Sequence, residues 1–576
     1  MPGFFACNSI AEFTLRDLYP NLCIRDKISI DEIGTVSRQT LNKFLDDKTI
    51  GETDQIIAVL EGYLLNRKEL YDKYKTDTIL NLIEIMNDTN GESFFKEFRG
   101  CFSGAVFLKK AKKWIFFTNQ IGDNPVFYYC SQGQIAVGSQ IEYLVDYCKS
   151  KDLELSFDEN CAYQLLTYGF VANDETFANE IRRLHGGCYL VYENNKLELK
   201  TYHRFKKHPS RYQGKTESEL IQLIDNCFRK AVELEWRKDD EYGYSYLADL
   251  SGGLDSRMNI WVAHELQDRH ITVLTYSKSN ELDELIAKQI TKYWNDELLF
   301  KPLDDISFMY DVDENTRLLG GLSLYSGITG GKRLLQSLNL SNYGLEHTGQ
   351  VGDAVIGSFY NKESDYRNNA ITGRYSEKLS DRLSIRVKDI SQQYNDNEIA
   401  LLYTRGFQGA CNTHLLRRNF TEVSSPFLNV DFIQLCLDLP LKARMNHKLY
   451  KKWIISTYPD AASFIWEKQG GKLTESKIRT TMRKTIAGGF SKARGILIQK
   501  ALNKHGMNPI DYWLDYNETA RRFLSDYEKE MIVNAKDCIS EKLYNDIDWM
   551  FNTGNALEKS MALTVLSSLK LYRFLD

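Results

Sequence analysis

The chain has 576 residues, more than one hydrophobic core usually organises, so several domains are expected. Its residues are 43% hydrophobic and 26% charged, and its net charge is only −5, which gives no reason to expect disorder or nucleic-acid binding. The cysteines are scattered without a CxxC pair, no apolar run reaches the roughly 18 residues of a membrane-spanning helix, and the N-terminus lacks a signal-peptide pattern. These features predict a reduced, cytoplasmic protein.

Short β-rich runs bounded by Gly, Asn or Pro dominate the first third of the chain, and one helical stretch at 76–88 stands among them. They predict an α+β domain with antiparallel sheets over residues 1–205, followed by a polar linker. The predicted strands lie in 103–110, 113–120, 124–130, 134–140 and 186–205.

From Glu217 the pattern changes to helices alternating with buried strands. A predicted helix is followed by a strand, a glycine turn, a second helix and a second strand, which is typical of a parallel sheet with crossover helices. The sequence therefore predicts a parallel-sheet domain over 206–475 and a helical C-terminal extension over 476–576. The elements on which this rests are 217–236, 242–250, 257–267 and 271–277.

The strongest motif is SGGLDS at residues 251–256, directly after a predicted strand and before a helix. Two adjacent glycines let the backbone curl so that several N–H groups face one anion, and the helix N-terminus adds partial positive charge. Asp255 would be repelled by a bare phosphate, so we interpret it as a Mg²⁺ ligand. A simple glycine turn with a capped helix is the alternative, which the complete string disfavours. GITGGKR at 327–333 lacks the first Gly and the final Ser/Thr of a Walker A loop.

SGGLDS resembles the pyrophosphate loop of the N-type ATP pyrophosphatases, and its surroundings are similar to the synthetase domain of asparagine synthetases. Other family motifs follow in the family order. Residues 275–277 with 283–284 resemble the segment that closes over the adenosine. HTGQVGD at 347–353 resembles the family's SGEGADE, and EVSSPFLN at 422–429 resembles EVRVPFLD. Leu439-Pro440 with Lys448 resembles the turn and helix that follow, and WEKQGG at 466–471 resembles the family's RxKxGF loop.

The resemblance implies a set of site residues. Asp353 would be the second Mg²⁺ ligand beside Asp255, and Lys468 would act on the phosphates of ATP. The remaining contacts to ATP would come from Leu250, Ser251, Gly252, Gly253, Ser256, Lys278, Thr348 and Gly349.

The first domain resembles a class II glutamine amidotransferase domain, which implies an Ntn-hydrolase-like sandwich. EGYLLN at 61–66 resembles NGEIYN, and GDNPVFYY at 122–129 resembles the G-K-K-P-L-Y-Y turn. Glutamine-hydrolysing members begin Met-Cys-Gly-Ile, whereas this chain has Pro2, which offers no thiolate nucleophile. The glutamine-binding RGPD segment is also missing. We therefore expect a degenerate domain without glutaminase activity.

The synthetase site departs from the family as well. Gln350 and Ala354 replace the two glutamates of SGEGADE, and a neutral glutamine cannot take a proton from an attacking amine. Either another residue acts as the base or the nucleophile arrives deprotonated. The resemblance therefore does not single out asparagine synthesis.

The implied reaction is ATP-dependent amide-bond formation through an acyl-adenylate, with release of AMP and pyrophosphate. Mg²⁺ held by Asp255 and Asp353 would neutralise the leaving pyrophosphate. The acceptor is either ammonia, as in amidation of a carboxylate, or an organic or internal amine, as in β-lactam synthetases and lasso-peptide cyclases. A non-catalytic scaffold is a third interpretation, which the paired carboxylates disfavour. The sequence does not specify the acid or the amine.

MNPIDYWLDYN at 507–517 and NALEKSMALTVLSSLKLYRF at 555–574 resemble the tails of family members from bacterial surface-polysaccharide pathways, which favours an acid other than aspartate. Within the C-terminal extension, residues 477–504 carry eight Lys or Arg and no Asp or Glu. A solvated helix face is one interpretation, and a docking surface for an anionic substrate, a lipid-linked sugar or a membrane is the other. A homodimer is left open, and no nucleic-acid partner is expected.

Overall fold

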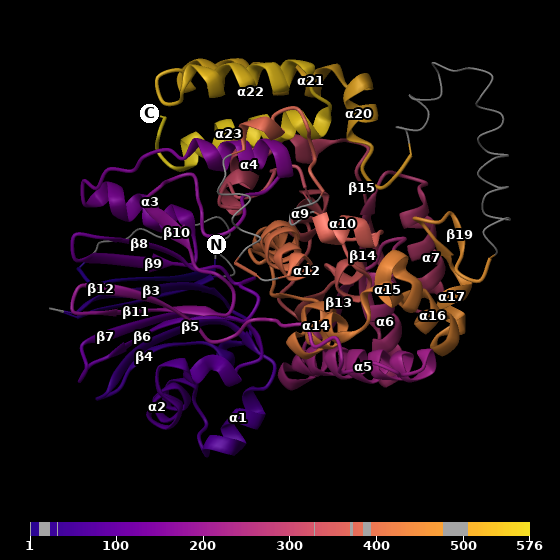
Figure 1. Ribbon diagram of the computed structural model, residues 1–576, viewed down its shortest axis with the longest axis horizontal. Coiled ribbons are helices and arrows are strands. Elements are labelled where there is room, and N and C mark those ends of the chain that lie inside the picture. The colour runs from indigo at the N-terminus through magenta and orange to yellow at the C-terminus, as the bar shows by residue number, and fades with distance from the viewer. Residues whose placement is uncertain are drawn as a thin grey trace.

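The computed structural model describes residues 2–10, 23–30, 33–327, 329–368, 373–383, 393–394, 396–475 and 505–575. Three parts are visible in Figure 1: a stack of strands on the left, a parallel-sheet domain on the right, and a layer of helices across the top. The basic segment 477–504 lies outside the described residues. Within them, every helix is too short or too polar to cross a lipid bilayer.

The N-terminal part consists of two six-stranded antiparallel sheets. One has the order β10-β8-β9-β1-β3-β2 and the other β12-β11-β7-β6-β5-β4. The strands are β1 (Gly3–Cys7), β2 (Cys23–Ile30), β3 (Gly34–Leu41), β4 (Thr49–Glu52), β5 (Ile56–Leu64), β6 (Gly100–Leu108), β7 (Lys113–Thr118), β8 (Phe127–Ser131), β9 (Gln134–Gly138), β10 (Ile181–Arg183), β11 (Cys188–Glu193) and β12 (Lys196–Thr201).

Apolar side chains from both sheets form one core between them, for example Phe4 and Val36 from the first sheet against Val59 and Phe116 from the second. Helices cover the outer faces (Figure 1). The second sheet packs against α2 (Ile79–Asn90), which follows α1 (Arg67–Tyr74). The first packs against α3 (Ile141–Ser150), which is followed by α4 (Glu159–Tyr168). This helix–sheet–sheet–helix stack confirms the predicted sandwich.

The second part is built on a five-stranded parallel sheet of order β15-β14-β13-β16-β17, as the sequence predicted. Its carboxyl edge gathers the loops that follow β13, β14 and β16, the usual place for a ligand in such a sheet. The central elements are α5 (Glu217–Tyr242), β13 (Ser245–Asp249), α6 (Asp255–Leu266), β14 (Ile271–Ser277), α7 (Leu282–Trp294), β15 (Glu297–Pro302), β16 (Tyr343–His347) and β17 (Val423–Ser424).

Short helices complete this domain. They are α8 (Val312–Leu318), α9 (Thr329–Gln336), α10 (Glu363–Asn368), α12 (Asn397–Leu401), α13 (His414–Arg417), α14 (Val430–Asp438), α15 (Leu441–Arg444), α16 (Lys448–Thr457) and α17 (Pro459–Ser463), with a small hairpin of β18 (Ile465–Trp466) and β19 (Gly471–Lys472). A π-helical turn at Asp353–Gly357 and a longer one at Leu402–Ala410 interrupt the α-helical pattern. Such turns are rare and are frequent at functional sites.

The C-terminal extension is helical where it is described, as predicted. It contains α20 (Ile510–Tyr516), α21 (Glu518–Ala535), α22 (Glu541–Thr553) and α23 (Ala556–Leu571). These helices lie across both other parts (Figure 1). Helix α23 packs against α4 and α8. The hydroxyl of Tyr163 donates to Asp546 at 3.0 Å, and the backbone N of Tyr325 donates to Thr564 at 3.1 Å. The extension is therefore a packed layer of the molecule.

Candidate active site

The glycine loop runs from the carboxyl end of β13 to the first turn of α6. Its backbone is fixed by hydrogen bonds: the N–H of Ser251 donates to the Ser256 Oγ at 3.1 Å, and that of Gly253 donates to the Ser251 Oγ at 3.2 Å. The N–H of Gly252 donates to the carboxylate of Asp283, in the first turn of α7, at 2.9 Å. The loop is thereby anchored to both helices.

The segment after β16 packs directly on the start of α6. A Cβ added at Gly349 would lie 2.2 Å from the backbone N of Ser256, and one added at Gly352 would lie 2.6 Å from the Asp255 Cγ. Only glycine fits at these two positions. As a result, the backbone N of Asp353 donates to the Asp255 Oδ2 at 2.9 Å. The two predicted metal ligands, far apart in sequence, are neighbours.

Asp255 sits in an electrostatically strained position. Burial and the negative charge of Asp353 raise the pKa of the Asp255 carboxyl to about 8. The Tyr450 hydroxyl donates to the Asp255 Oδ1 at 2.8 Å, and the charge of Lys468 also opposes the rise. Desolvation and a like charge both disfavour the ionised form of a carboxyl group, so this pair would be stabilised by an added cation.

Two cavities meet at Asp255. One, of about 260 Å³, lies along the glycine loop and the ends of β13 and β14, and the other, of about 610 Å³, extends past Asp353 toward Arg405. Both are lined by Asp255, Gly327, Gly349 and Gln350. A ligand in each cavity would therefore meet its neighbour beside Asp255.

Most of the residues expected to contact ATP border the smaller cavity, namely Leu250, Ser251, Gly253, Asp255, Ser256, Thr348 and Gly349. Gly252 does not border this cavity, and its backbone N–H donates to the Asp283 carboxylate. Lys278 is not in the lining: its Nζ pairs with Glu281 at 3.0 Å, and its backbone N donates to the Met507 carbonyl at 2.9 Å.

Lys468 borders the larger cavity together with Asp353. Its Nζ lies 3.4 Å from the Nε2 of His447, which lines the same cavity. Burial, and then the positive charge of Lys468, lower the pKa of His447. The backbone N of Glu467 donates to the Gly252 carbonyl at 3.1 Å, so the segment that carries Lys468 is docked on the glycine loop.

Sequence reasoning missed several residues at the smaller cavity. Arg417 donates to the Asp249 carboxylate at 2.6 Å and also contacts the Glu346 carboxylate and the Tyr276 hydroxyl. Arg417 and its partners come from a helix and three separate strands, so no local sequence pattern predicts their contacts. Met507 and Asn508, just before α20, also line this cavity, and nothing in the extension's sequence indicated that.

The first domain shows a different arrangement where Pro2 and Glu61 meet the second domain. The cavity there is only about 30 Å³, room for about one water molecule. Burial raises the pKa of Glu61 to about 7, against the charges of Lys48 and Arg38. The buried Lys48 Nζ pairs with Glu422 at 2.9 Å.

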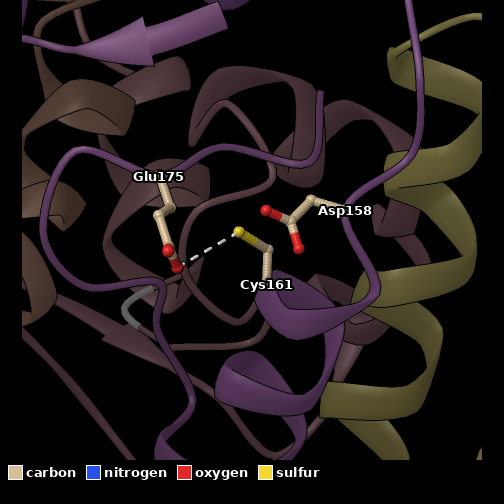
Figure 2. Close-up of side chains that lie close together, drawn as sticks. All are labelled: Asp158, Cys161 and Glu175. Carbon is tan, nitrogen blue, oxygen red and sulfur yellow. Dashed lines mark hydrogen bonds between the residues drawn. The ribbon is translucent and has the colours of Figure 1, made fainter. Parts of the chain in front are cut away.

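Three ligand-type side chains also gather near α4 (Figure 2): Asp158, Cys161 and Glu175. Each carboxylate already accepts hydrogen bonds. Asp158 caps α4 by accepting from the Asn160 N–H at 2.9 Å, and Glu175 accepts from the side-chain amides of Asn160, at 2.9 Å, and Gln164. The cluster therefore serves the start of α4, and we assign no metal to it.

Comparisons with known proteins agree with this architecture. Residues 50–203 match a glutamine amidotransferase domain family. A putative glutamine-hydrolysing asparagine synthetase of Mycobacterium bovis is 23% identical over 235 residues, and those of two Mycobacterium tuberculosis strains match equally. The match covers 38% of this chain and only 35% of each mycobacterial protein.

Two solved structures were matched, both at low similarity. Glutamine phosphoribosylpyrophosphate amidotransferase from B. subtilis is 8% identical with a TM-score of 0.23, over 52% of this chain and 84% of that one. An allosteric regulatory enzyme of purine biosynthesis is 7% identical with a TM-score of 0.22, over 46% and 66%. The domain match and the mycobacterial relatives support a relationship to an asparagine synthase-like family with a glutamine amidotransferase domain.

Proposed function

We propose that this protein is an ATP-dependent ligase that activates a carboxylic acid as an acyl-adenylate, releases pyrophosphate, and transfers the acyl group to ammonia with release of AMP. The observation that carries the proposal is the pair Asp255 and Asp353 at the junction of two cavities. The smaller cavity, along the glycine loop, would hold the nucleotide, and the larger would hold the acid. The reacting atoms would then meet beside the carboxylates.

ATP and Mg²⁺ are the cofactors that we propose. The two adjacent carboxylates, with the pKa of Asp255 raised by burial and by Asp353, are an oxygen donor set suited to a hard divalent cation. When bound, Mg²⁺ supplies charge neutralisation for the departing pyrophosphate. Lys468 would hold a positive charge beside the phosphates, and the backbone N–H groups of the glycine loop would orient them.

We also propose that His447 takes the proton of the attacking amine. Gln350 stands where a base would be useful, but its side-chain amide donates to the Ala410 carbonyl at 2.9 Å and has no proton-accepting group of suitable pKa. His447 lines the acid cavity, and its lowered pKa keeps the imidazole neutral at pH 7. A neutral imidazole can accept a proton.

The ammonia would come from solution, because we propose that the first domain does not hydrolyse glutamine. Pro2 supplies no nucleophile, and the small cavity beside it has no room for a glutamine side chain. Joining the acid to an organic amine is a second candidate. The larger cavity, of about 610 Å³, favours it because there is space beside the acid for more than ammonia.

The decisive experiment is ATP–pyrophosphate exchange, screened across carboxylic acids with Mg²⁺ present. At least one acid should support exchange in the wild type and none in Asp255→Asn. The exposed Asp537→Asn is the matched control and should behave as wild type. Exchange that persists in Asp255→Asn, or a wild type that exchanges with no acid, would overturn the proposal.

A further inference from the structure

The larger cavity contains a cation that the proposed chemistry does not use. Arg405, in the π-helical turn Leu402–Ala410, lines it and is partly buried. Among the residues that the structure describes, Arg405 makes no ion pair or hydrogen bond with an acidic side chain, and its guanidinium lies 5.1 Å from the centre of the Phe359 ring. Other arginines of this domain have hydrogen-bond partners: Arg444 pairs with Glu398 at 2.8 Å, and the buried Arg257 donates to backbone carbonyls such as that of Ala461.

An unpaired guanidinium in a cavity is set up to bind an anion. Its planar fork of donors matches a carboxylate or a phosphate group, and such a pair is worth more in a partly desolvated site than in water. The acid's reacting carboxylate would be occupied beside Asp255, at the junction with the nucleotide cavity. Arg405 would therefore meet a second anionic group of the same molecule.

Aromatic side chains line the larger cavity, and two of them pack closely on glycines. A Cβ added at Gly169 would lie 2.4 Å from the Tyr375 ring, and one added at Gly409 would lie 3.1 Å from the Phe170 ring. Phe170, Tyr375 and the ring under Arg405 all line the cavity. Flat apolar walls favour a ring that stacks against them.

The volume points the same way. A cavity of about 610 Å³ falls in the roughly 300–1,000 Å³ range of sites that enclose drug-sized ligands. A four-carbon acid such as aspartate would leave most of it filled with water. The cavity thus suits a longer acid whose middle portion reaches the aromatic walls.

We propose that the acid substrate carries a ring and a second anionic group, and that Arg405 binds that group. This inference rests on the proposed function, because it takes the larger cavity to be the acid site. The second anion is either a carboxylate or a phosphate, which the guanidinium recognises in the same way.

The test uses two matched pairs of probes with the full-length protein, Mg²⁺ and α,β-methylene-ATP. The dissociation constant of each probe is measured. N-benzoylaspartate is compared with N-benzoyl-β-alanine, which lacks the second carboxylate, and glucuronic acid 1-phosphate is compared with methyl glucuronide, which lacks the phosphate. Within each pair, only one member carries the second anion. Wild type should bind that member at least about tenfold more tightly in one pair or both, as a charged hydrogen bond predicts. A preference in one pair alone identifies the anion as carboxylate or phosphate, and a preference in both shows that Arg405 accepts either.

Arg405→Gln should reduce this preference to less than about twofold, whereas Arg405→Lys should keep part of it. Arg521→Gln, an exposed arginine on α21, is the control and should bind like wild type. The inference is overturned if wild type shows no preference in either pair or if the preference survives Arg405→Gln. It is also overturned if that substitution weakens the binding of the nucleotide and leaves the preference between probes unchanged. Failure of the proposed function has a separate signature, which is the absence of ATP–pyrophosphate exchange with every acid.

Discussion

Two regions of the molecule bring charged side chains together, and they combine the charges in opposite ways. At the contact between the first and second domains, Lys48 faces Glu422 and Arg418 faces Asp123, at 2.9 and 3.0 Å, around a cavity of about 30 Å³. At the carboxyl edge of the parallel sheet, Asp255 borders two cavities of about 260 and 610 Å³, and the like charge of Asp353 is close enough to raise its pKa.

The paired charges at the domain contact contribute to stability, whereas the like charges at the sheet edge are arranged to bind a ligand. Opposite charges that satisfy one another leave nothing for a ligand to improve, so the first region holds the domains together. Like charges side by side cost free energy until a ligand arrives. Strain of this kind is common at functional sites.

The largest expected effect comes from removing one of the like charges. Asp255→Asn and Asp353→Asn should each lower ATP–pyrophosphate exchange about a thousandfold or more, because the cation would lose a ligand where pyrophosphate leaves. Both proteins should remain folded, with far-UV circular dichroism unchanged. Near-normal exchange in either variant would show that the carboxylate pair is not part of the chemistry.

Replacing the proposed base should split the two half-reactions. His447→Gln should slow amide formation about a hundredfold, the contribution typical of general base catalysis, while exchange changes by less than about threefold. The exposed His270→Gln serves as the control. If amide formation and exchange fall together, His447 acts on adenylation or on the structure instead of on the amine.

Breaking an opposite-charge pair should affect stability more than chemistry. Lys48→Met leaves Glu422 buried without its partner, which costs about 3–5 kcal/mol and should lower Tm clearly. The same change in the exposed Lys452–Glu217 pair should cost less than about 1 kcal/mol. Equal losses of Tm in the two variants would mean that the interdomain pair has no special weight.

The smallest effect is expected when a nucleophile is introduced at the N-terminus of the first domain. Pro2→Cys should release glutamate from glutamine no faster than wild type, with or without ATP, because the adjoining cavity has no room for the substrate. The measurement is glutamate formation over a blank that lacks protein. A rise in that rate would show that the first domain needs only a thiol to regain glutaminase activity.

Contiguous patterns made much of this arrangement predictable. The SGGLDS motif predicted the loop and the position of Asp255, and periodicity predicted the strands after Gly100 and the helices of the extension. The first strands were missed for physical reasons. β5 is buried along its whole length and so lacks an alternating pattern, and β2 reads CIRDKISI, an edge strand rich in charge.

The cavity side chains could not have been found in the same way. Tyr450 reaches Asp255 across 195 positions of sequence, and Arg417 joins acids from two different strands. Arg405 lies in a π-helical turn that no residue pattern announces. Long-range packing decides such contacts, and a single sequence carries no signal for them.

The docking of the extension onto the nucleotide cavity has a thermodynamic consequence. Met507 and Asn508 line that cavity, and the Met507 carbonyl accepts from the Lys278 N–H at 2.9 Å. If a nucleotide binds only when these residues are docked, binding must stabilise the docked extension by the same free energy, about 2.7 kcal/mol at a hundred times Kd. Saturating nucleotide should then slow proteolytic removal of the C-terminal helices, so that the far end of the chain reports on occupancy of a site more than 200 residues earlier in the sequence.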